Sequence, residues 1–144
     1  MKATFLALPL MAGSLIGTAA AAQDAPEASA AAYAATVDPA AFHERRNEHK
    51  KTGVTVSPAA VRLVMPGVDK FSIYNLIGPP HFGEGITRKW NYVLFFPPAA
   101  GTAERLRCRM EIRFGREDAD RYDVVVTEVV WKNQTCADRV AAAG

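Results

Sequence analysis

Hydrophobic and polar residues alternate along three segments in the second half of the chain, residues 89–96, 105–114 and 122–131. A period of two residues is typical of a β-strand with one buried face and one face in solvent. The inward positions are Trp90, Tyr92, Leu94, Phe96, Leu106, Cys108, Met110, Ile112, Phe114, Val125, Val129 and Trp131. The connections are short, whereas a parallel pair needs a crossover of about a dozen residues or more. The three strands are therefore predicted to form an antiparallel meander.

Two short helices are predicted before the first of these strands. Asp69 can cap a helix over residues 70–77, because its carboxylate accepts hydrogen bonds from the free N–H groups of the first turn. Gly78, followed by two prolines, stops that helix. A Ser-Pro pair at residues 57–58 starts another helix, which a Pro-Gly pair at residues 66–67 ends. Both helices carry apolar residues on one side, so we expect both to pack on the sheet.

This order of elements predicts an α+β domain over residues 54–140, with two short helices packed on one face of a three-stranded antiparallel sheet. Residues 23–41 are mostly Ala with Pro, Ser, Asp and Glu, and they offer little apolar surface to bury. Residues 42–51 are dense in charge. We therefore interpret residues 23–53 as a disordered tether followed by a charged, solvated segment.

The first 22 residues have the parts of a secretory signal peptide. Lys2 gives a positive start, an apolar and small-residue stretch follows, and Ala20 to Ala22 form a cleavage site before Gln23. The apolar stretch is shorter than the roughly 20 residues that a membrane-spanning helix needs, and no cysteine adjoins the site. We expect cleavage between Ala22 and Gln23, and a periplasmic mature chain that neither spans the membrane nor carries a lipid.

Charge and cysteine content narrow the function classes. The formal net charge of the 144 residues is only +2, which gives no reason to expect a nucleic-acid partner. The only two cysteines, Cys108 and Cys136, favour a disulfide in an exported protein. Cys108 lies at an inward strand position, and the five residues after Trp131 give Cys136 enough chain to fold back to it. The three histidines lack metal-binding spacings, so we expect no metal and no cofactor.

A row of arginines marks the outward positions of the second strand, namely Arg105, Arg107, Arg109 and Arg113. Glu111 and Glu128 lie on the same side, and ion pairs across neighbouring strands are the common explanation of such a row. We favour that structural interpretation. Binding of an anionic lipid or of an acidic partner is the alternative.

The turn at residues 81–85 is the loop with the most chemistry in the chain. His81 and Glu84 have the residue types of an acid and a base, but no nucleophile or second carboxylate stands near them in the sequence. The glycines in this turn do not form a phosphate loop, because a strand follows them where that motif needs a helix. Phe82 is expected to plug the helix layer. We therefore do not expect an enzyme.

The segment PGVDKFSIYNLIGPPHFGEGI, then WNYVLFF, then Cys108 in an alternating strand, then Trp131 with Cys136 shortly after, carries a family resemblance. It resembles the SmpA/OmlA domain typified by BamE of the outer-membrane β-barrel assembly machinery. The chain looks most similar to the version of that domain at the N-terminus of some OmpA-family proteins. The similarity spans about residues 57–138.

The resemblance implies a non-enzymatic periplasmic interaction module in outer-membrane or cell-envelope biogenesis or maintenance. Its partner would be an envelope protein, with the β-barrel assembly machinery as one candidate. The alternative is a secreted inhibitor or ligand-binding protein with the same helix-on-sheet architecture. The residues that we select as a candidate partner surface are His81, Phe82, Glu84, Arg107 and Arg109.

Overall fold

The computed structural model describes residues 33–43, 45–46, 48–85, 88–116 and 124–144. The expected signal peptide and its cleavage site at Ala22 and Gln23 lie outside these residues. Within the described ranges, no helix is long and apolar enough to cross a membrane.

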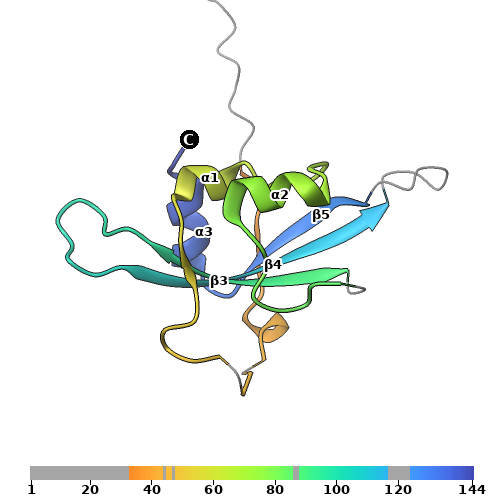
Figure 1. Cartoon of the computed structure of the whole chain (residues 1–144). Coiled ribbons are helices and arrows are strands. Elements are labelled where there is room, and N and C mark those ends of the chain that lie inside the picture. Colours follow the sequence, from red (N-terminus) through yellow and green to blue (C-terminus); the bar gives the residue numbers. More distant parts are fainter. Residues whose placement is uncertain (1–32, 44, 47, 86–87, 117–123) are drawn as a thin grey trace, which may run out of the picture.

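The core of the fold is a mixed sheet of five strands. Their order across the sheet is β1 (Thr36–Val37), β5 (Val124–Trp131), β4 (Leu106–Arg116), β3 (Lys89–Phe96) and β2 (Val54–Thr55). The three long strands are antiparallel to one another, whereas β1 runs parallel to β5 and β2 runs parallel to β3. The short strands therefore extend both edges of the meander (Figure 1).

The helices lie together over one face of this sheet (Figure 1). They are α1 (Pro58–Arg62), α2 (Lys70–Ile77) and α3 (Gln134–Ala141), and a single 3-10 turn, η1, covers Pro39–Ala41. The predicted bounds of α2 are confirmed. Its cap is also as expected, because the Asp69 carboxylate accepts from two backbone N–H groups at 2.9 and 3.0 Å, and Gly78 ends the helix with a φ of 80°.

The predicted fold is wrong in two respects. The sheet has five strands of mixed direction instead of three antiparallel ones, and α3 joins the two expected helices. The added strands have only two residues each, so they are too short to show an alternating pattern. β1 and η1 lie within the Ala-rich stretch that we interpreted as a tether, so the described chain is folded against the sheet from its first residues.

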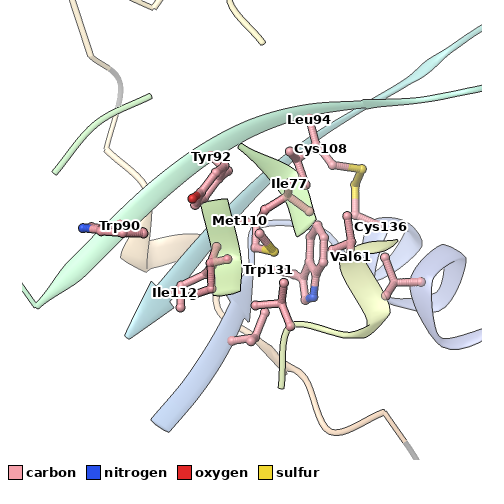
Figure 2. Close-up of a cluster of buried hydrophobic side chains, with 14 of the residues drawn as sticks. Val61, Ile77, Trp90, Tyr92, Leu94, Cys108, Met110, Ile112, Trp131 and Cys136 are labelled. Atoms are coloured by element: carbon pink, nitrogen blue, oxygen red, sulfur yellow. A yellow bond between two sulfur atoms is a disulfide. The ribbon is translucent and has the colours of Figure 1, made fainter. Parts of the chain in front are cut away.

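The helix-side core is built from large apolar side chains of β3, β4 and β5 that meet the helices (Figure 2). The predicted disulfide is confirmed: Cys108 of β4 is bonded to Cys136 of α3, with their Cα atoms 5.8 Å apart. It fixes α3 over the sheet close to Trp131 (Figure 2). A register shift between β4 and β5 changes one predicted position, since Val126 and not Val125 joins this core.

The opposite face of the sheet, which we call the outer face, is buried as well. The alternating pattern predicted that its side chains point to solvent, yet Asn91, Val93, Arg109, Glu111 and Val130 are all buried. The covering layer consists of residues 38–43, 45–46 and 48–53, which pass across the sheet on the side away from the helices (Figure 1). Its anchor is Phe42, whose exposed fraction is 7%. This layer creates the candidate site described next.

Candidate functional site

A pocket of about 510 Å³ opens on the outer face, between this covering segment and β4. Among the described residues, five cationic side chains and one carboxylate line it, namely Arg45, Lys50, Arg107, Arg109, Lys132 and Glu48. Its volume lies within the range of about 300–1,000 Å³ that is typical of small-ligand sites. The excess of cations makes the pocket attractive to anions.

The centre of the pocket is a carboxylate held by two arginines. Glu48 Oε1 accepts from Arg107 Nη2 at 2.7 Å, and Glu48 Oε2 accepts from Arg109 Nη1. Burial alone raises the pKa of Glu48, but the hydrogen bond from Arg107 and the charge of Arg109 outweigh it and hold this pKa below the ordinary value. Glu48 is therefore ionised at neutral pH, and the three side chains form a charge-assisted network.

Arg109 is the most deeply placed of these cations, with an exposed fraction of 6%. The Phe42 ring covers its guanidinium, whose central carbon lies 5.5 Å from the ring centroid. Arg109 Nε and Nη2 are buried and have no hydrogen-bond partner among the described residues. The backbone also brings Lys132 to the site, because its N–H donates to the Arg109 carbonyl at 3.1 Å.

Phe82 links the pocket to the edge of the sheet. Its backbone exchanges hydrogen bonds of 2.8 and 3.1 Å with Asn91 of β3, and the Arg45 guanidinium lies 4.9 Å from its ring centroid. Phe82 therefore covers part of the β3 edge and supports a residue that lines the pocket. This differs from the expected role as a plug of the helix layer, because the contact with Arg45 is on the side of the covering segment.

His81 and Glu84 do not act as a pair. The Val93 N–H donates to His81 Nδ1 at 3.3 Å, whereas the Glu84 carboxylate accepts from the Tyr74 hydroxyl of α2 at 2.7 Å. Burial lowers the pKa of His81, although the negative charge of Glu48 opposes that shift. Each side chain thus makes a structural hydrogen bond of its own, and the arrangement provides no shared acid–base centre.

The arginine row is held in three different ways. Arg113 bonds Glu111 of its own strand at 2.9 Å and Glu128 across the sheet at 2.8 Å, which agrees with the favoured interpretation. The Arg105 guanidinium lies 4.9 Å from the centroid of the Phe95 ring. Arg107 and Arg109 bind a glutamate from a distant part of the chain, as described above, which the cross-strand argument did not predict.

Of the five residues selected as a partner surface, the structure brings Arg107 and Arg109 into one pocket and places Phe82 beside it through Arg45. Sequence reasoning missed Arg45, Glu48, Lys50 and Lys132. A signal for the first three was present, because Phe42 is a single large apolar residue at the start of a charged run. Such a residue can anchor a segment to a surface, which would place the charges that follow it over the sheet.

The described residues contain no group of three or more His, Cys, Asp or Glu side chains that could hold a metal ion. The sequence matches no protein-family model and no curated protein.

Proposed function

We propose that this protein is a non-enzymatic protein-interaction module of the periplasm that works in outer-membrane or cell-envelope biogenesis or maintenance. The sequence features that support this proposal are the signal-peptide pattern and the resemblance to the SmpA/OmlA domain. The disulfide between Cys108 and Cys136 is consistent with export, since disulfides persist in oxidising compartments. The partner is an envelope protein, with the β-barrel assembly machinery as the first candidate.

The observation that carries the proposal is the arginine pair on the outer face. Arg107 and Arg109 hold a carboxylate in a pocket that has further cations at its rim. Buried or half-buried arginines that donate charge-assisted hydrogen bonds to a carboxylate are typical of sites that recognise acidic groups. The pocket is thus a surface on which a partner with acidic side chains can be held.

The separate roles of His81 and Glu84 support binding over catalysis. A general acid and base must both reach the reacting atoms, whereas these two side chains are engaged with different elements, β3 and α2. Substituting either one should lower stability, because each closes a structural hydrogen bond.

Chemical cross-linking in the intact envelope tests the proposal, followed by purification of the protein and identification of what is attached. Lys50 lines the pocket and its neighbour Lys51 does not, although both are exposed. We expect an envelope protein to be recovered with the wild type and with Lys51→Glu, and to be lost with Lys50→Glu. Equal melting temperatures of the two variants would show that the fold is unaffected. Recovery of the same proteins with all three forms, or of none with the wild type, would refute the proposal.

A further inference from the structure

We propose that Glu48 occupies the site of an acidic partner segment, and that carboxylates of that segment displace it from Arg107 and Arg109. This inference rests on the proposed function, since it names the chemistry of the partner at the same pocket. The ligand class is a peptide segment with at least two Asp or Glu side chains.

The carboxylate of Glu48 is bound in a defined geometry between two arginines. Arg107 and Arg109 lie two positions apart on β4, so their side chains project from the same face of the sheet. Glu48 bridges them, with one oxygen on each guanidinium. The structure thus shows a carboxylate fitted into this place, and it comes from a residue about sixty positions away in the chain.

The carboxylate of Glu48 does not satisfy every hydrogen-bond donor of Arg109. Arg109 uses only Nη1 for Glu48, and its buried Nε and Nη2 lack a hydrogen-bond partner among the described residues. A carboxylate that binds a guanidinium in the two-pronged manner typical of arginine would reach two nitrogens at once. Both nitrogens are closed to solvent while the covering segment is in place, so an incoming carboxylate can make these hydrogen bonds only once Glu48 and the segment around it have moved.

The rim of the pocket carries further positive charge. Arg45, Lys50 and Lys132 line the same pocket, and Glu48 is the one carboxylate among the described residues that line it. A single acidic group would leave most of this positive charge uncompensated. A segment with several carboxylates would neutralise it, and electrostatic attraction would also speed the encounter.

The segment that carries Glu48 can release it without disrupting the sheet. The hydrogen bonds of the backbone around it are local: Glu48 N–H donates to the Arg45 carbonyl, and Thr52 N–H donates to the His49 carbonyl, both at 2.9 Å. The segment is secured to the sheet at its two ends, by Phe42 and by β2. Displacing Glu48 therefore breaks side-chain contacts and leaves the hydrogen bonds of the sheet intact.

The position of the pocket favours a peptide over a membrane surface. Of the four exposed large apolar residues in the described part of the chain, Leu63, Met65 and Phe71 lie in α2 or between α1 and α2, and these helices cover the side of the sheet away from the pocket (Figure 1), whereas Val54 lies on the edge strand β2. A membrane-binding surface combines basic side chains with apolar ones that enter the bilayer. Here three of the four exposed apolar residues lie on the face opposite to the basic pocket, and the fourth, Val54, is a single side chain at the sheet edge.

Calorimetric titration of the purified mature protein tests the inference without any partner protein. The probe is an acetylated peptide of alternating Glu and Gly, and the control is the same peptide with Gln in place of Glu. We expect binding of the Glu peptide alone, with an affinity that falls as salt is added. In Glu48→Gln the internal competitor loses its charge, so this variant should bind the Glu peptide about tenfold more tightly.

Two matched variants complete the design. Glu104→Gln makes the same change at an exposed carboxylate outside the pocket and should leave the affinity as it is. Lys132→Gln removes a rim cation and should weaken binding several-fold. Equal affinities of the wild type and Glu48→Gln would overturn the inference, as would a wild type that binds neither peptide at millimolar concentration.

Further titrations distinguish binding of an acidic peptide from binding of other anions. Inorganic phosphate and phosphatidylcholine vesicles with and without phosphatidylglycerol are tested under the same conditions. Binding to either anion source without binding to the Glu peptide would overturn the inference in favour of phosphate or lipid recognition. If the peptide fails but the cross-linked envelope partner still depends on Lys50, the proposed function stands and only the ligand class is wrong.

Discussion

Replacing Phe42 by Ala tests whether the outer face is covered as described. Phe42 is the anchor of the covering segment, with an exposed fraction of 7%, and its ring lies over the guanidinium of Arg109. Without the ring, apolar surface of the sheet is opened to water and Arg109 loses its aromatic neighbour. The matched control is Phe71→Ala, which makes the same change at a helix residue with an exposed fraction of 79%.

The magnitude follows from the burial of the two rings. Truncating a buried Phe to Ala typically costs about 3–5 kcal/mol of the free energy of unfolding. We expect the lower end, about 3 kcal/mol, because the covering segment can settle into the space that the ring leaves. At the exposed position of Phe71 the same change should cost less than about 0.5 kcal/mol.

Urea unfolding of the mature protein, with the disulfide intact, measures both values. Fluorescence of Trp90 and Trp131 reports the transition, and the slope of the free energy against urea should be nearly the same in all three proteins. If Phe42→Ala costs no more than Phe71→Ala, the segment is not packed on the sheet. The reasoning about the pocket would then fail, because Glu48 reaches the arginines only through that packing.

Three further predictions concern stability and titration. Reducing the disulfide between Cys108 and Cys136 should lower the free energy of unfolding by about 3–4 kcal/mol, the chain-entropy value for a sequence separation of 28; an unchanged urea midpoint with reductant would contradict this. Because burial depresses the pKa of His81 in the folded state, stability should be full above the unfolded His pKa of about 6.5 and should fall as the pH drops through and below it. The imidazole must be neutral to accept the hydrogen bond from the Val93 N–H. In His81→Gln the free energy of unfolding should therefore fall less between neutral and mildly acidic pH than it does in the wild type, as urea unfolding at several pH values would show. Burial raises the pKa of Tyr33 to about 12, although a hydrogen bond from the Trp131 indole opposes this shift. Ultraviolet titration should therefore find a tyrosine that ionises well above the ordinary tyrosine pKa, and this ionisation should be absent in Tyr33→Phe.

Local sequence signals correctly predicted the elements whose capping, ending or alternation is encoded within their own residues. The helix over Lys70–Ile77 follows from its own cap and its own stop, and the long strands follow from their own alternation. The disulfide follows from there being only two cysteines in a chain with an export signal pattern. The helix and the strands form because of interactions among residues that are close in sequence. The disulfide could be predicted because each cysteine has only one other cysteine to pair with.

The rest of the fold depends on contacts that no local pattern reveals. The two residues of β1 become a strand only because β5 offers them a free edge. The N-cap residue of α3 is Asn133, whose side chain makes no cap hydrogen bond, and the helix is held instead by Cys136 and Val140, which pack against the core. Tertiary packing decides such elements more than propensity does.

The candidate site shows the same limit. Alternation on β4 correctly separated Cys108 and Met110 from Arg107 and Arg109, but it assigned the second face to solvent. That conclusion assumes a two-layer domain. A third layer, supplied by the segment that carries Phe42, turns the polar face into a buried one with a pocket.

In the folded protein the buried Arg109 binds the carboxylate of Glu48. A double-mutant cycle with Glu48→Gln, Arg109→Gln and the double variant measures their interaction directly, by urea unfolding of all four proteins. For a half-buried, charge-assisted pair we predict a coupling free energy of about 2 kcal/mol. A coupling free energy indistinguishable from zero would contradict the account, because it would show that Glu48 and Arg109 do not interact in solution.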